Sequence, residues 1–313
     1  MIDVVILFFI LGLTAGLLRS ELKLPAALYD SLTLVLLLTI GLKGGEGLAK
    51  QALGPLLPQL GMVILLGVAQ TLIAFAILRA VGKLGKADAA ATAAHYGSVS
   101  VATFAVGTNW LITRNIAFEP QLTIFLTVME VPAIIVGIVL ARGLSRKTDW
   151  RSLAHESFLG KGVTLLMGGM AIGWIAGPVG LEPIRELFFD LFKGALALFL
   201  LEMGLIVANQ VSELRRRGLF IVTFGLLMPL LSAMLGLGFG VAMGLSVGGT
   251  TLLATLAASA SYIAVPATMR LAVPEANPAL SLAAVLGVTF PFNILAGIPL
   301  YHWLAVKFAG ANI

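Results

Sequence analysis

The chain has 313 residues, of which 59% are hydrophobic and only 11% charged, with a formal net charge of +5. A soluble domain carries about 25% charged residues, and a mean hydropathy of +1.04 is instead typical of a chain embedded in lipid. The sequence has no cysteine, which excludes disulfides, thiol nucleophiles and thiolate metal sites.

Ten apolar segments are predicted to be transmembrane helices, since a helical span needs roughly 20 mostly apolar residues. In chain order they cover residues 2–19, 25–48, 57–82, 87–111, 120–142, 160–178, 185–211, 218–242, 247–271 and 278–308. The first is interpreted as a retained helix and not a signal peptide, because Asp3 precedes it and Arg19 follows without a cleavage pattern. The fold class expected is therefore an all-α membrane protein.

The fourth segment is interrupted near its middle by Gly97, Ser98 and Ser100, with Thr103 one turn further on. Gly97 tolerates irregular backbone. A break there would free N–H groups at the start of the second half-helix, where the dipole favours an anion, and carbonyls at the end of the first, where a cation can bind. Serine hydroxyls can serve either ion.

Two titratable side chains lie close to this region. Glu130 is halfway along the fifth segment, where a carboxylate is costly and is expected to be a cation ligand or part of a gating ion pair. A structural hydrogen bond to an adjacent helix is the alternative. His95 precedes the first break and is expected to pack or hydrogen-bond, with a proton relay as the alternative.

The basic residues predict the orientation in the membrane. Loops after the odd-numbered segments hold fourteen of the twenty Lys and Arg residues and the opposite side holds five, which places both termini outside the cytoplasm. The run of arginines at 215–217 is interpreted as an anchor near anionic lipid. Within the seventh segment, Lys193 is interpreted as an anchor that reaches the interface, and no role is assigned to Glu202.

The ninth segment carries a second interruption. Ser259, Ser261 and Tyr262 follow one another there, and Pro266 cannot donate its backbone hydrogen bond. Small and hydroxylated residues can also serve only to pack membrane helices together. Because two Ser-x-Ser elements occupy corresponding places, we favour the interpretation as a binding site.

The correspondence comes from an internal repeat of about 160 residues. The matching stretches are 28–42 with 191–205, 97–100 with 258–261, Gly12 and Gly16 with Gly169 and Gly173, and 137–138 with 297–298. Residues 1–142 are thus the first repeat, 143–159 a cytoplasmic linker and 160–313 the second repeat. Five segments is an odd number, so the repeats are predicted to be inverted, with the two broken helices crossing near the midplane, as in secondary transporters.

Catalytic functions find no support in the sequence. The three histidines, His95, His155 and His302, fall in different segments, and no HExxH, GxSxG or Walker pattern is present. We therefore expect a protein that is not an enzyme, that binds no nucleic acid and no cofactor, and whose transport is driven by a gradient or by a separate subunit.

Six stretches resemble the sodium-dependent bicarbonate permease family, the SbtA-like transporters. They are LLTIGLKGGEGL from Leu37, YGSVSVATFA from Tyr96, MEVPAII from Met129, LFKGALALFLLEMGL from Leu191, SASYIAVPATMRLAVPEANP from Ser259 and FPFNILAGIPLY from Phe290. The resemblance implies a homotrimer in a bacterial plasma membrane. It also implies a gate or scaffold domain of segments 1, 2, 6 and 7, and a core of segments 3–5 and 8–10 that moves like an elevator.

The resemblance implies an anion site and a sodium site. Its candidate residues for the anion are Gly97, Ser98, Ser100, Ser259 and Ser261. Those for the coupling cation are Glu130, Tyr262 and Thr103, with Na⁺ near Ser261, Tyr262 and Glu130.

Three features depart from the cyanobacterial members of that family. Tyr262 stands where they carry an acid, Val101-Ala102 where they carry a second Gly-Ser, and the linker of about twenty residues where they carry a long polar insertion. The first departure argues against sodium dependence, and the short linker against control by a PII-like regulatory protein.

Sodium-coupled uptake of bicarbonate is accordingly the function expected. The alternatives are a carrier for another small anion, coupled to protons through Glu130 or His95, and a channel or receptor of the same fold in which Tyr262 fills the site.

Overall fold

A computed structural model describes residues 3–49, 54, 56–143, 151, 155 and 159–309, and within these ranges all regular structure is helical. Among the described residues, seven helices are long and apolar enough to cross a membrane. The principal helices are α1 (Val4–Leu17), α2 (Ala26–Leu48), α3 (Leu56–Ala80), α4 (Lys86–Gly97), α5 (Val101–Ile112), α6 (Leu122–Arg142), α8 (Lys161–Leu181), α9 (Phe192–Arg217), α10 (Leu219–Ala242), α11 (Val247–Ala258), α12 (Ala264–Ala272), α13 (Pro278–Ala284), α14 (Phe290–Phe292) and α15 (Ile298–Ala309). The linker expected at 143–159 lies mostly outside the described residues.

Three of the ten expected segments are not single long helices. α1 has only 14 residues, too few by itself for a hydrocarbon core about 30 Å thick. The fourth segment consists of α4 and α5, separated at residues 98–100, and the ninth consists of α11 and α12, separated at residues 259–263. Ser98 and Ser259 each adopt an extended backbone directly after the first half-helix. The chain is therefore interrupted at both Ser-x-Ser elements.

Prolines shape the helices of the second half. In α8 the backbone is non-helical at Gly177, whose φ is 59°, directly before Pro178. The last expected segment contains two π-helical turns, at Val285–Thr289 and Asn293–Gly297. A proline ring collides with the carbonyl four residues earlier in a regular helix, and the carbonyls facing Pro291 and Pro299 fall inside these wider turns. The widened turns let one continuous span pass through both prolines.

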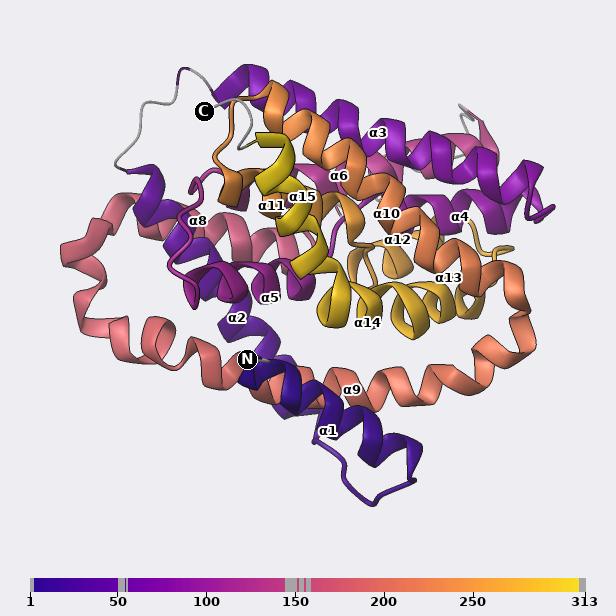
Figure 1. Cartoon of the computed structure of the whole chain (residues 1–313), viewed down its shortest axis with the longest axis horizontal. Coiled ribbons are helices and arrows are strands. Elements are labelled where there is room, and N and C mark those ends of the chain that lie inside the picture. The colour runs from indigo at the N-terminus through magenta and orange to yellow at the C-terminus, as the bar shows by residue number, and fades with distance from the viewer. Residues whose placement is uncertain are drawn as a thin grey trace.

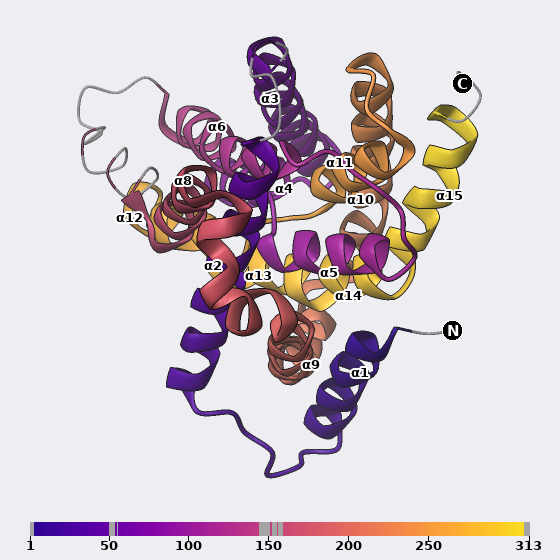
Figure 2. The same ribbon diagram turned by 90° about the vertical axis from the view of Figure 1, so that its left-hand side faces the viewer.

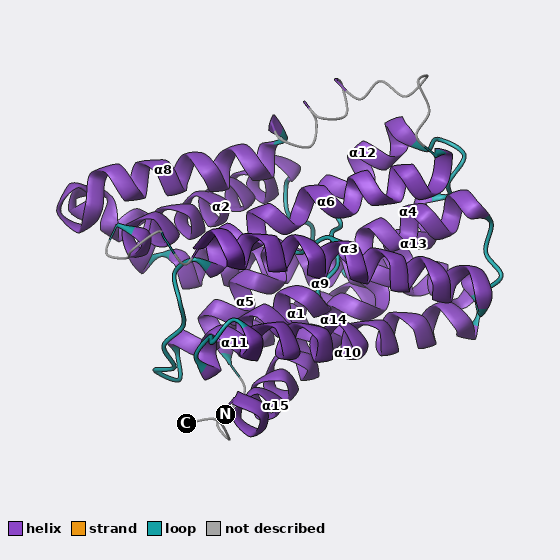
Figure 3. Cartoon of the chain, turned by 90° about the horizontal axis from the view of Figure 1, so that it is seen from above, coloured by secondary structure: helices purple, strands orange, loops and turns teal. Residues whose placement is uncertain are grey.

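The helices form two groups. α1 packs along α9 and α2 along α8, whereas α3, α4 and α6 pack together, as do α10, α11 and α15. Figure 1 shows α1 and α9 along the lower edge and α3 and α10 along the upper edge. The side view in Figure 2 shows α1 and α9 together below α5, α13 and α14, with α2 beside α8, and Figure 3 shows the same bundle from above.

Glycines permit the two closest helix crossings of the first group. A Cβ on Gly12 or Gly204 would meet backbone atoms across the α1 and α9 contact, and a Cβ on Gly41 or Gly173 would do so between α2 and α8. Glycine lets helix backbones approach in a membrane, where packing drives association. These glycines fall at the offsets of the repeat predicted from the sequence.

We expect the α1 and α9 crossing to tolerate no added methyl group. Gly204→Ala should lower the free energy of unfolding by about 1–3 kcal/mol, because its Cβ would meet the Phe9 carbonyl and force the helices apart. Gly194→Ala is the matched control, since Gly194 lies in the same helix and faces open space. It should be neutral or stabilising by up to about 1 kcal/mol. Unfolding in mixed micelles measures both, and equal effects would contradict the close crossing.

Candidate functional site

The two interrupted helices bind one another through their breaks. The backbone N–H of Ser100 donates to the Ser259 hydroxyl at 2.9 Å. In the reverse direction, the backbone N–H of Ser261 donates to the His95 carbonyl at 2.9 Å. The His95 ring nitrogen Nδ1 lies 2.6 Å from the Ser261 carbonyl oxygen. His95 therefore links the two breaks, as its structural interpretation predicted.

The other serine hydroxyls stabilise the ends of the half-helices. The Ser100 hydroxyl accepts from the Thr103 N–H at 3.2 Å and so caps α5. The Ser261 hydroxyl accepts from the Val265 N–H at 3.4 Å at the start of α12. Serine is a favoured cap because its oxygen satisfies an N–H that has no partner inside the helix. The Ser98 hydroxyl instead donates to the Glu130 carbonyl at 3.4 Å, which holds the first break against α6.

Gly97 ends α4 where α3 approaches most closely. A Cβ at this position would collide with the Thr71 hydroxyl and lie 2.8 Å from the Gly67 carbonyl. A side chain here would push α3 away from the break. The glycine is thus required by packing at the end of the half-helix.

A cavity of about 190 Å³ lies where α5 and α12 begin. Val101 and Ala102 from α5 and Ile263 and Ala264 from the start of α12 form one wall, and α2, α8 and α9 supply the other. The four serines do not line it. They hold in place the two helix ends that do.

These helix ends suit an anion. The first N–H groups of a helix have no acceptor within it, and the helix dipole places partial positive charge there. Ser100 caps Thr103, whereas the N–H groups of Val101 and Ala102, two residues that line the cavity, have no acceptor in their own helix. Two such ends at one cavity form a preformed receptor for a small negatively charged ligand.

Glu130 supplies the acidic group of the same cavity. Its side chain is only 4% exposed, and its Oε2 atom has no hydrogen-bond partner. A buried carboxylate without a partner is costly, so this oxygen is suited to a cation or a proton. Lys161, at the cavity rim, is already paired with Asp30 at 3.1 Å.

Two other candidates for the cation do not line this cavity. The Tyr262 ring packs edge-on against Phe290, with centroids 5.6 Å apart, and its hydroxyl is buried without a hydrogen-bond partner. Thr103 contributes its backbone N–H to the Ser100 cap and is buried. Neither residue lines the cavity. Within the described residues, no three His, Asp or Glu side chains gather as a metal cluster. Of the three, only Glu130 lines the cavity, although Thr103 belongs to the first turn of α5.

Two amide side chains that the sequence interpretation did not select complete the second break. The Asn293 side-chain amide donates to the Ala258 carbonyl at 2.8 Å, and the Gln70 amide donates to the Ala257 carbonyl at 2.7 Å. The Tyr301 hydroxyl in turn donates to Asn293 at 2.7 Å. These amides satisfy the carbonyls at the end of α11. An isolated Gln or Asn within an apolar segment was the signal that could have identified them.

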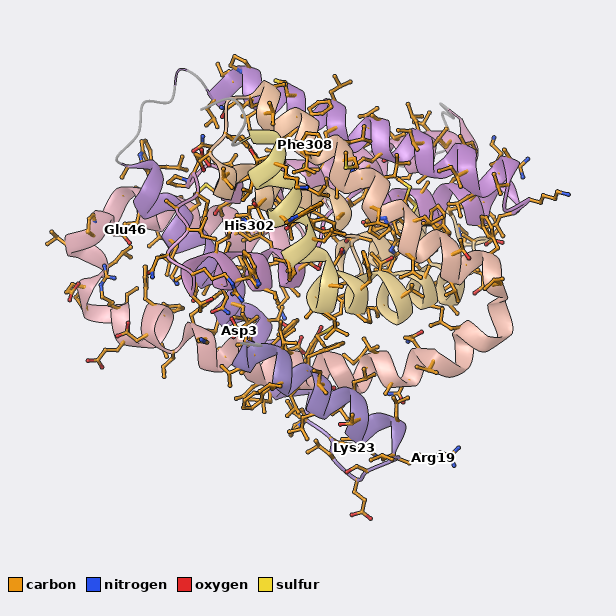
Figure 4. All side chains as sticks on the ribbon, viewed as in Figure 1. Asp3, Arg19, Lys23, Glu46, His302 and Phe308 are labelled. Carbon is orange, nitrogen blue, oxygen red and sulfur yellow. The ribbon has the colours of Figure 1, made fainter. Side chains whose placement is uncertain are left out.

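Outside the breaks, Lys193 and Asp3 lie near one another. The Lys193 ammonium is 3.9 Å from an Asp3 oxygen, and Asp3 also accepts from the Asn109 amide at 2.9 Å. Figure 4 shows Asp3 at the N-terminal end of α1. Glu202 has one buried carboxylate oxygen without a partner. The side chains at 215–217 lie outside the described residues.

A comparison with protein families gives a match over nearly the whole chain. The family model described as the Na⁺-dependent bicarbonate transporter superfamily matches residues 4–306, nearly the whole chain. None of the curated proteins matches the chain.

The contact between the breaks predicts a specific loss of stability. Ser259→Ala removes the acceptor of the Ser100 N–H and leaves that group buried, which should cost about 1–3 kcal/mol. Ser31→Ala is the control, because the exposed Ser31 hydroxyl bonds only to the Ala27 carbonyl of its own helix. It should change stability by less than about 0.5 kcal/mol. Chemical unfolding in detergent compares them, and equal losses would contradict the role of Ser259.

Proposed function

The chain belongs to the Na⁺-dependent bicarbonate transporter superfamily, and we propose that it is a secondary active transporter that takes up bicarbonate together with sodium. It is a multi-pass membrane protein of a transporter family, not an enzyme family. The observation that carries the proposal is the cavity at which α5 and α12 begin with Glu130 beside them.

Bicarbonate fits the helix ends for an electrostatic reason. A singly charged oxyanion entering the cavity would accept hydrogen bonds from the N–H groups of Val101 and Ala102 and lie at the positive ends of two helix dipoles. The capped N–H groups of Thr103 and Val265 are already satisfied. In this proposal the serines do not contact the anion. They orient the helix ends that bind it.

Sodium fits the carboxylate in the same cavity. Sodium is a hard cation that prefers oxygen ligands, and Glu130 Oε2 is a buried oxygen without a partner. An anion at the helix ends and a cation at Glu130 would each reduce the cost of burying the other, because opposite charges attract strongly where water is excluded. This mutual stabilisation is the proposed basis of coupling.

We propose that the chain forms two inverted repeats of five segments that move by an elevator-like mechanism. The repeat-related glycine crossings and the two repeat-related breaks support the inverted arrangement. α1, α2, α8 and α9 would be the gate domain, and the remaining helices the mobile core. The cavity lies between these groups, so a shift of one against the other would change the side to which it opens.

A homotrimer is the proposed assembly, and the exposed apolar side chains of α8 offer a surface for a second protomer or for lipid. Those most exposed are Trp174 (53%), Ile175 (81%) and Val179 (87%). The proposal includes no PII-like partner, because the linker is short.

A proton-coupled carrier for another small anion is the second candidate. It is favoured by the same lone carboxylate, because Glu130 can hold a proton instead of sodium. Uptake that follows a pH gradient in sodium-free buffer would identify this alternative.

Sodium coupling has a direct measurement. Proteoliposomes containing the purified chain should accumulate radiolabelled bicarbonate when sodium is higher outside, because inward sodium flow drives the anion. Without a sodium gradient the label should only equilibrate. Equal accumulation in the two conditions would contradict coupling.

Glu130→Gln should raise the sodium concentration for half-maximal uptake by about tenfold or more, because losing a charged ligand costs over 1.4 kcal/mol of sodium binding. Glu21→Gln is the control, since Glu21 is exposed and lines no described cavity. The measurement is initial uptake rate against sodium concentration. A Glu130→Gln variant with an unchanged sodium dependence would exclude Glu130 as the coupling residue.

A further inference from the structure

We propose that Lys43 and Thr123 form a second binding site for a small oxyanion, in a separate cavity that serves as the vestibule of the first. The inference rests on the proposed transport function for the identity of its ligand. The site itself is assigned from the residues that line the cavity.

The second cavity measures about 220 Å³ and lies between α2, α5, the start of α6 and the start of α9. Apolar side chains such as Phe104 and Phe192 form most of its wall. Its polar groups are Lys43, Thr108 and Thr123. A small apolar cavity with a few convergent polar groups is the usual form of a ligand site.

Lys43 brings a positive charge to this cavity. Its ammonium lies 4.5 Å from the centre of the Phe192 ring and 5.4 Å from that of Phe189, and it makes no ion pair with any residue of the described ranges. Two acids, Asp190 and Glu46, act on Lys43 electrostatically, and Glu46 also lies 3.9 Å from Arg185, which pairs with Glu182 at 3.0 Å. Figure 4 shows Glu46 at this end of the molecule. The Lys43 ammonium is thus not held in a close ion pair with a described residue and can reach a ligand in the cavity.

The two threonines complement that charge. The Thr123 hydroxyl makes no hydrogen bond to any described residue, so it can donate to an anion. The Thr108 hydroxyl donates to the Ala105 carbonyl at 2.9 Å, which leaves its oxygen free to accept. Bicarbonate has two oxygens that could accept from Lys43 and Thr123 and one hydroxyl that could donate to Thr108. A small oxyanion with a proton matches all three groups.

The two cavities lie in series along the same pair of helices. The first turns of α5, with Val101 and Ala102, line the first cavity, and the later turns, with Thr108, line the second. Along α2, Leu37 lines the first and Lys43 the second. The two linings adjoin on α5, where Phe104, only 1% exposed, lines the second cavity and its neighbour Ala105 lines the first. An anion held by Lys43 would therefore lie one barrier away from the helix ends.

The orientation predicted from the basic residues indicates which side of the membrane the second cavity faces. α2 and α5 both run toward loops that the charge distribution places outside the cytoplasm, at residues 49–55 and 113–121. The Gly160–Val163 stretch that borders the first cavity lies at the opposite side of this predicted topology. The second cavity thus faces the compartment from which the anion is taken up.

Uptake kinetics separate a binding role from a role as an interfacial anchor. Lys43→Met should raise the KM for bicarbonate from outside by about 5–10-fold with little change in kcat, because the local anion concentration falls when the charge is removed. Lys43→Arg should keep KM within about twofold, since the charge remains. Lys307→Met is the matched control, because Lys307 also lies over an aromatic ring, 3.9 Å from the centre of Trp303, but lines neither cavity. A KM for Lys43→Met equal to that of Lys307→Met would overturn the proposal.

A labelling experiment tests the same site without relying on transport. The chain has no cysteine, so Thr123→Cys introduces its only thiol. With Lys43 present, an anionic methanethiosulfonate reagent should react several-fold faster, relative to a cationic one, than when Lys43→Met is added. Bicarbonate should slow the reaction only when Lys43 is present.

Equal reagent ratios in the two backgrounds, or a thiol that does not react, would overturn the site, because the cavity would then be uncharged or closed to small anions. If the labelling result holds but sodium-driven uptake is absent, the site stands and the proposed transport function fails. If uptake is sodium-driven but the ratio of anionic to cationic labelling is the same with and without Lys43→Met, only the second binding site is contradicted.

Discussion

The hydrogen bond from the Ser100 N–H to the Ser259 hydroxyl, with its counterpart from the Ser261 N–H to the His95 carbonyl, is the contact on which the site depends. In lipid, an interrupted helix leaves backbone groups that no water can satisfy. Each break here supplies partners for the other. The irregular backbone is therefore stable only while the two helices remain in contact, and the cavity lies at the helix ends that this contact fixes.

Polar side chains extend that arrangement outward. Asn293 and Gln70 satisfy carbonyls at the end of α11, and Tyr301 fixes the orientation of Asn293. In the first cavity, the buried Glu130 carboxylate keeps one oxygen without a hydrogen-bond partner. In the second, Lys43 makes no ion pair with any described residue. The two unpaired charges have opposite signs, and the structure places them at successive cavities along α5.

The helices on one side of the first cavity are closely packed against one another. Glycines bring α1 onto α9 and α2 onto α8 with backbones nearly touching, which makes this group rigid. The first cavity lies between that group and the helices that carry the breaks. A rigid partner on one side and a preformed pair of helix ends on the other is the arrangement that an elevator-like movement would require.

The sequence by itself determined the helical class, the family, and the location of both interruptions, because apolar length, Gly and Pro positions and the repeat are local or periodic signals. It also singled out Glu130, since an acid in an apolar segment is conspicuous. Only the tertiary structure decided that the serines cap and join the half-helices instead of lining the cavity. It alone showed that Tyr262 and Thr103 do not line that cavity, and that Lys43 and Thr123 share a second cavity. Which atoms face a cavity depends on how helices distant in sequence pack, and residue spacing along one helix carries no record of that packing.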